Sequence, residues 1–115
     1  MRIQEFYKEI GSDYEETARR LGSEELIRKF ALKFLSDPSF EELENAFAEH
    51  EVEKAFRAAH TLKGVAINLG FDALYKQAYD LTEKLRGKSF DDTETLFTNV
   101  QREYGRVADA LRSLE

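Results

Sequence analysis

The sequence predicts an all-α protein. An antiparallel up-and-down four-helix bundle is expected over residues 39–114, with additional short helices over residues 1–36. Apolar residues recur at intervals of three and four rather than two, which is the period of an amphipathic helix. Glycines stand where the apolar stripes end, and short connections between long helices favour antiparallel neighbours. Since the chain has 115 residues, we expect one domain over residues 1–115.

The first two helices are short. One is expected over residues 3–10 and ends at Gly11; the next covers residues 13–21 and ends at Gly22. Glycine suits the residue after a helix end because it adopts left-handed backbone geometry without strain. These two segments are therefore expected to pack on one end or side of the bundle.

Ser23 has the position of an N-cap for a third helix. This helix is expected to end near Asp37, because the residue before Pro38 leaves helical geometry. The apolar stripe expected on its core side contains Leu26, Ile27, Phe30, Ala31, Phe34 and Leu35.

Ser39 and Glu42 have the spacing of a capping box, which predicts a fourth helix through about Glu49. A break near His50 leads to a long fifth helix that ends at Gly70. The core residues expected on these two helices are Leu43, Ala46, Phe47, Val52, Ala55, Phe56, Ala59, Leu62, Ala66 and Leu69.

Two further helices complete the bundle. The first is expected over residues 71–86 and closes at Gly87, and the last over residues 92–114. Their apolar positions again recur at three and four, which places one face of each against the core. These positions are Leu74, Ala78, Leu81, Leu85, Leu96, Val100, Tyr104, Val107, Leu111 and Leu114.

Composition excludes several classes of function. The chain has no cysteine, so it forms no disulfide, thiolate metal site or thiol nucleophile, which fits a reducing cytoplasm. Its formal net charge of −6 argues against general nucleic-acid binding. No apolar run approaches the roughly 20 residues of a membrane span, and the N-terminal stretch lacks the pattern of a signal peptide. We expect a cytoplasmic protein that binds neither nucleic acid nor membrane.

His60 is the candidate reactive residue. At about 100° per residue it falls roughly 120° from the centre of the apolar stripe, at the solvent edge of the fifth helix. A solvent-facing imidazole has an unperturbed pKa of about 6.5, so a good fraction is neutral and keeps a free lone pair. Such a ring is a competent nucleophile toward phosphorus.

The neighbours of His60 suit a phosphoryl group. Lys63 and Arg57, each three residues away, supply positive charge, and no Asp or Glu occurs over residues 54–71. Gly64 leaves space beside the ring, and Ile67 lies on the same face. Taken singly, each residue has a plainer interpretation: an exposed histidine is usually ordinary surface, and a mid-helix glycine is commonly a close helix contact.

The segment HTLKGVAINLG, residues 60–70, resembles the motif of the histidine-containing phosphotransfer (HPt) domain family. The matching positions are His60, Leu62, Lys63, Gly64 and Gly70, five positions in eleven. The resemblance covers essentially the whole chain, since length and helical pattern agree with it. It differs after the Lys-Gly pair, where small residues are common in the family and this chain has Val65 and Ile67.

The resemblance implies a phosphorelay intermediate. His60 accepts a phosphoryl group from the aspartyl phosphate of a receiver domain, or from a hybrid sensor histidine kinase, and passes it to a response-regulator aspartate. Lys63 neutralises the phosphoryl oxygens and Gly64 gives the partner clearance, with Arg57, Ile67 and Gly70 as binding residues. The partner supplies the Mg²⁺, so no metal site or other cofactor is expected here, and the chain is expected to be a monomeric carrier rather than an enzyme.

A partner for the second ring nitrogen can be sought across the hairpin that Gly70 predicts. Antiparallel packing places His60 opposite about Tyr79, with Thr82 and Glu83 one turn further along. One of these three is expected to hydrogen-bond the imidazole and fix its tautomer. The alternative, that they are ordinary core or surface residues, stays open for each.

The sequence leaves two alternative functions to consider. A non-catalytic helical adaptor would bind a partner through exposed aromatic residues such as Phe6 or Tyr7. An enzyme in its own right is disfavoured, because no Ser-His-acid set, glycine-rich phosphate loop or zinc motif appears. The only other histidine, His50, has no spacing to His60 that suggests a shared metal.

Overall fold

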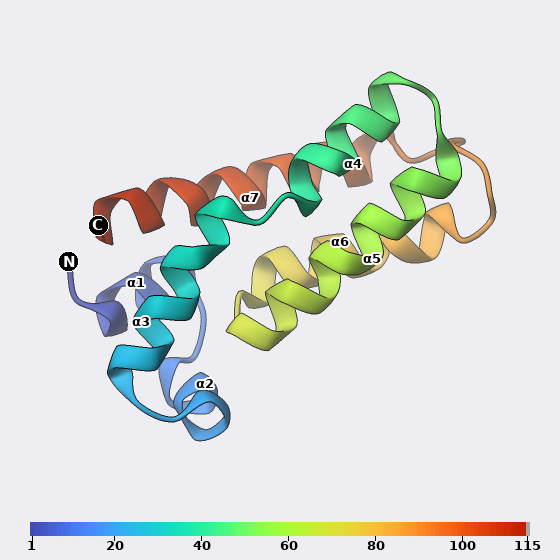
Figure 1. Ribbon diagram of the computed structural model, residues 1–115. Helices are drawn as coiled ribbons and strands as arrows, with labels where there is room; N and C mark the ends of the chain where they lie inside the picture. The colour runs from blue at the N-terminus through green and yellow to red at the C-terminus, as the bar shows by residue number, and fades with distance from the viewer. Residues whose placement is uncertain (115) are drawn as a thin grey trace.

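The computed structural model describes residues 1–114, and each element it forms in this range is helical. The all-α prediction is therefore confirmed. Among these helices, none combines the length and apolar character needed to cross a membrane. The elements are α1 (Ile3–Glu9), α2 (Tyr14–Leu21), α3 (Glu24–Lys33), a 3-10 turn η1 (Phe34–Ser36), α4 (Ser39–Ala48), α5 (Val52–Leu69), α6 (Asp72–Leu85) and α7 (Glu94–Leu114) (Figure 1).

Helices α4 to α7 form a helical bundle. Helix α5 packs along both α4 and α6, and α6 packs on α7. Stacked aromatic rings join α4 to α7, with centroid distances of 3.9 Å for Phe40 with Tyr104 and 4.0 Å for Phe47 with Phe97. Most buried positions of α5 and α6 are the predicted ones, including Ala55, Ala59, Leu62, Ala66, Leu74, Ala78, Leu81 and Leu85. Ala58 and Thr82 are also buried, although the apolar stripes did not include them. Val52 and Phe56 were expected in the core but are only partly buried, because they lie at the edge of the packed face of α5. One face of α5 is thereby fixed to a packed core.

Gly70 forms the turn between α5 and α6. Its φ of 76° and ψ of 26° are left-handed, as expected of a glycine that ends a helix. A second constraint comes from α2, because a Cβ at position 70 would overlap the hydroxyl of Thr17. Only glycine meets both the backbone geometry and the close approach of α2.

The N-terminal helices hold the same turn through hydrogen bonds. The buried Tyr7 hydroxyl donates to the carbonyl of Leu69 at 2.6 Å. From α2, Arg20 donates to the carbonyl of Ile67 at 3.1 Å. Both carbonyls lie in the last turn of α5, where the regular helical pattern of N–H donors ends. The Ile67 carbonyl also accepts the N–H of Gly70 at 3.2 Å. Helices α1 and α2 therefore complete the C-terminal end of the helix that carries His60.

The predicted apolar stripe of α3 was too wide. Ile27 and Ala31 are fully buried and Phe34 nearly so, but Leu26 and Phe30 remain 43% and 38% exposed. Helix α3 lies at one end of the molecule, beside α2 and the bundle (Figure 1). Neighbouring helices cover only a narrow face of α3. The period of apolar residues shows which side of a helix faces inward, but it does not show how wide the covered face is.

The predicted capping box at Ser39 was wrong. Helix α4 begins at Ser39, and the residue before it, Pro38, makes no side-chain cap. Instead, Asp37 accepts a hydrogen bond from the backbone N–H of Ser39 at 2.9 Å and another from its hydroxyl. The carboxylate of Asp37 does the capping from one residue further out.

The exposure expected for Phe6 and Tyr7 was also wrong. Both side chains are fully buried. Their rings meet edge to face at 5.1 Å, and Phe6 also packs on Phe71 at 5.7 Å. They fix α1 to the α5–α6 turn and offer no surface to a partner.

Candidate functional site

Helix α5 presents His60 to solvent. Ala59 and Leu62, on either side of it in sequence, are fully buried, so the ring points away from the bundle core as the helical count predicted. Its aromatic neighbour is Phe56, one turn earlier, with ring centroids 6.1 Å apart. Among residues 1–114, none makes a hydrogen bond to the ring nitrogens. The imidazole is accessible and both nitrogens are free.

Gly64 lies one turn after His60 and is also exposed. A Cβ built at this position meets no atom within 4 Å beyond its own helix turn. The interpretation of Gly64 as a close helix contact therefore does not hold. The missing side chain leaves space on the solvent side, next to the imidazole, where only an external molecule can use it.

Two cation–π contacts define how α5 and α6 align. Lys63 Nζ lies 5.5 Å from the centre of the Tyr79 ring, and the Arg86 guanidinium lies 5.0 Å from the centre of the Phe56 ring. Interpolating between these pairs places His60 level with residues 82–83. The predicted position opposite Tyr79 is off by about one turn, because Gly70 and Phe71 both lie outside the helices.

Thr82, Tyr79 and Glu83, the three expected partners of the imidazole, differ in burial and in the contacts that they already make. Thr82 is fully buried, and its hydroxyl donates to the carbonyl of Ala78 at 2.6 Å. Tyr79 is 43% exposed and lies under Lys63. Glu83 is exposed and accepts a hydrogen bond from Arg86 at 2.9 Å. Within residues 1–114, none of the three is hydrogen-bonded to the ring.

The neighbours of Glu83 lower the pKa of its carboxyl group. The hydrogen bond from Arg86 lowers the pKa of the Glu83 carboxyl. Desolvation opposes this in part, and the nearby charges of Arg86, Lys63 and His60 lower the pKa further. The carboxyl is therefore ionised at neutral pH. The negative charge of Glu83 therefore lies close enough to His60 for the two side chains to interact electrostatically.

Arg86 is the site residue that the sequence analysis missed. It lies just after the last residue of α6 and is 55% exposed at its side chain. Together with Lys63 it gives the neighbourhood of His60 two cations from two different helices. Arg86 lies one turn beyond Glu83 on the same face of the α6 segment, so the antiparallel pairing predicted for the hairpin also leads to it.

The remaining predicted residues lie at different distances from His60. Ile67 is 41% exposed, two turns along α5 on the same side as His60. Gly70 is buried at the end of the helix, about 15 Å along the axis from His60 at 1.5 Å per residue. The structure groups His60 with seven residues as one surface, here called the His60 surface: Phe56, Lys63, Gly64 and Ile67 from α5, and Tyr79, Glu83 and Arg86 from the α6 segment.

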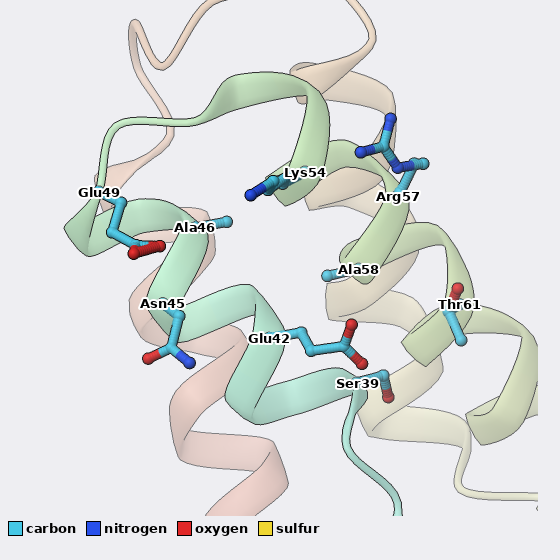
Figure 2. Close-up of a pocket in the computed structure, with 9 residues that line it drawn as sticks. All are labelled: Ser39, Glu42, Asn45, Ala46, Glu49, Lys54, Arg57, Ala58 and Thr61. Carbon is cyan, nitrogen blue, oxygen red and sulfur yellow. The ribbon is translucent and has the colours of Figure 1, made fainter.

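Arg57 lies at the edge of a hollow of about 380 Å³ between α4 and α5. Figure 2 shows Lys54 and Arg57 on the α5 side, with Glu42 on α4 and Glu49 just after the end of α4 on the other. Since carboxylates line the hollow, its charge is mixed and does not favour an anion. Arg57 borders this hollow and is not part of the cation–π pairs around His60.

The arrangement fits one kind of chemistry best. A neutral imidazole in water is a nucleophile, and the cations Lys63 and Arg86 can compensate an anionic group placed on it. The open space at Gly64 admits a large partner. In residues 1–114 no group of three or more His, Asp or Glu side chains is arranged to hold a metal ion.

Comparison with known proteins gives one match. A family model described as the Hpt domain matches residues 35–112. The matched range contains the entire His60 surface and helices α4 to α6, while α1 to α3 precede it. No curated protein and no solved structure matches the chain.

Proposed function

The chain belongs to the Hpt domain family, whose role is phosphotransfer in two-component phosphorelays, and on this premise we propose that His60 carries the phosphoryl group. In the proposed reaction His60 accepts the group from the aspartyl phosphate of a receiver domain, or from a hybrid sensor histidine kinase, and gives it to the aspartate of a response regulator. The chain acts as a carrier, and the partner provides the catalysis.

One observation supports this proposal above the others. An exposed imidazole stands beside an exposed glycine that has no packing reason within residues 1–114. A glycine inside a helix costs roughly 1 kcal/mol relative to alanine. Core packing and helix geometry do not explain why position 64 is glycine. Space for a docking receiver domain does explain it.

The transfer step needs no group beyond His60 and the partner. A ring nitrogen of neutral His60 attacks the phosphorus, an N–P bond forms, and the P–O bond to the partner's aspartate breaks, leaving a carboxylate. The other ring nitrogen keeps its hydrogen during the step and loses it afterwards to water. Positioning and charge compensation do most of the work in such transfers, and Lys63 contributes the nearest positive charge on α5.

The proposal includes the partners and the setting. Mg²⁺ is bound by the acidic pocket of the receiver, and this chain contributes no metal ligand. The bundle is antiparallel and up-and-down, which holds α5 rigid while the partner docks. We expect a monomer in the cytoplasm, in keeping with the absence of cysteine.

The test is incubation with a receiver domain phosphorylated on its aspartate by radiolabelled phosphate. We expect the wild-type chain to acquire an acid-labile, base-stable label, and His60→Gln to acquire none. His50→Gln is the matched control, since it removes the other histidine and is expected to label normally. Persistent label in His60→Gln, or its loss in His50→Gln alone, contradicts the proposal.

An adaptor without phosphotransfer gives a different result. It would bind a receiver with an affinity that neither His60→Gln nor phosphorylation of the receiver changes, and no label would move. The fully buried state of Phe6 and Tyr7 removes the residues on which that alternative was based.

A further inference from the structure

The inference concerns the charges beside His60 and rests on the proposed function. A phosphoryl group on His60 brings a charge of about −1.5 to −2 to an exposed helix surface. Lys63 and Arg86 supply positive charge there, and Glu83 supplies negative charge. The balance among these three affects how strongly His60 retains the group relative to the partner's aspartate.

Arg86 is already engaged in the structure. Its Nη2 lies 2.9 Å from Oε2 of Glu83, and its guanidinium covers the ring of Phe56 at 5.0 Å. The Phe56 ring is in turn 6.1 Å from the ring of His60. Arg86 is thus one aromatic ring away from the phosphoryl position and is held by a carboxylate on its own helix turn.

The Glu83–Arg86 pair is exchangeable. The two side chains are 42% and 55% exposed, and exposed ion pairs contribute little net stability because water and salt screen them. A phosphoryl group offers Arg86 more negative charge and more acceptor oxygens than one carboxylate does. A phosphoryl group on His60 would therefore compete with Glu83 for the Arg86 guanidinium.

We propose that Glu83 lowers the affinity of His60 for the phosphoryl group, both by competing for Arg86 and by repelling the added negative charge. A carrier must not store the group too tightly, because it has to give it to the next aspartate. Glu83 is in this sense a tuning residue for the equilibrium between phosphohistidine and aspartyl phosphate, and it takes no covalent part in the transfer.

The structure offers a matched control on the same helix. Asp80 forms an ion pair with Lys76 at 3.4 Å, and its side chain is 40% exposed, close to the 42% of Glu83. At 100° per residue Asp80 points about 100° away from Tyr79, whereas Glu83 and Arg86 lie within about 40° of it. Asp80→Asn therefore removes the same charge and a similar pair away from the His60 surface.

The experiment measures the equilibrium constant for transfer between one phosphorylated receiver and the chain at low ionic strength. We expect Glu83→Gln to shift it toward phosphohistidine by about two- to fivefold. Arg86→Gln is expected to shift it the other way, and Asp80→Asn to leave it unchanged. Because the groups are exposed, all shifts are expected to shrink at 1 M salt, where the Debye length is about 3 Å.

Three results would overturn the inference: an unchanged equilibrium in Glu83→Gln, a shift away from phosphohistidine, or an equal shift in Asp80→Asn. Equal slowing of forward and reverse transfer is one case of the first result, and it identifies Glu83 as a docking contact. The proposed function is checked separately by reaction of the wild-type chain with phosphoramidate, a small phosphoryl donor. Labelling of His60 there with no effect of Glu83→Gln rejects this inference alone.

Discussion

Lys63 Nζ lies 5.5 Å from the centre of the Tyr79 ring, so the lysine that follows His60 by one turn leans onto the neighbouring helix. The ring limits the rotamers of a long side chain that would otherwise move freely in water. Its charge is thereby kept on the His60 surface, over the ring of Tyr79. Under the proposed function, this contact gives α6 a part in phosphoryl transfer at His60.

Lys63→Ala is expected to slow phosphoryl transfer to His60 by about tenfold, less than the loss seen for a buried oxyanion donor because the site is open to water. The bundle is expected to keep its stability within about 0.5 kcal/mol, since Lys63 is outside the core. Rapid-quench transfer kinetics and urea unfolding measure the two quantities. A variant as fast as wild type would show that Lys63 has no part in charge compensation.

The Tyr79 ring can be tested apart from its hydroxyl. Tyr79→Phe keeps the aromatic face under Lys63 and is expected to transfer like wild type, whereas Tyr79→Ala is expected to slow transfer about two- to threefold. In a chain that already carries Lys63→Ala, the change to alanine should have no further effect. If Tyr79→Phe alone slows transfer, the hydroxyl rather than the ring is the important group.

Gly64 and Gly105 are a matched pair of mid-helix glycines, since a Cβ at either meets no atom within 4 Å. Alanine at either position is expected to raise the free energy of unfolding by roughly 1 kcal/mol. Leucine at position 64 is expected to slow transfer from a receiver at least tenfold by occupying the docking space, and leucine at position 105 to leave it unchanged. Circular dichroism and transfer kinetics decide the outcome; equal slowing by both would refute the clearance role.

Gly70→Ala is expected to destabilise the protein by about 1–2 kcal/mol from its left-handed backbone alone, and by more because of the overlap with Thr17. Adding Thr17→Ala removes the overlapping hydroxyl and is expected to recover part of the loss. The backbone part stays, since φ is unchanged. Urea unfolding of the two variants separates the contributions, and no recovery in the double variant would show that α2 does not press on the turn.

Burial raises the pKa of the Tyr7 hydroxyl, which donates to the carbonyl of Leu69, and the charge of Arg20 offsets only part of this rise. The unfolded chain ionises this tyrosine near pH 10 while the folded chain does not. Its contribution to stability is therefore complete below about pH 10 and is lost progressively above it.

Tyr7→Phe tests this pH dependence. At pH 7 it is expected to cost about 1 kcal/mol, because the hydrogen bond to Leu69 is lost. Between pH 10 and 11 the gap to wild type is expected to narrow, since phenylalanine has no proton to lose. Urea unfolding across this range provides the measurement, and a gap that stays constant would show that Tyr7 titrates alike in both states.

The apolar period predicted the helix bounds to within about two residues, except at the end of α3. That end was expected near Asp37, but α3 ends at Lys33 and the 3-10 turn η1 follows it. Gly70 was identified as the end of α5 from its type and place alone. The exposure of His60 followed from the same count, because the angle around one helix depends only on position in the sequence. Sequence patterns failed where two neighbouring residues could both cap the same helix. Asp37 caps α4 in place of the predicted Ser39, since both residues are good caps and only the backbone path decides between them.

The sequence alone determined the helices, their inward faces and the solvent-facing His60 with its neighbour Lys63, because these depend on spacing along one chain segment. Tertiary structure decided which residues come to His60 from elsewhere. The α5–α6 turn sets the alignment that places Glu83 and Arg86 beside His60, and the packing of α1 and α2 on that turn buries Phe6 and Tyr7. A shift of one helical turn between packed helices changes every such neighbour while leaving the apolar pattern of each helix the same.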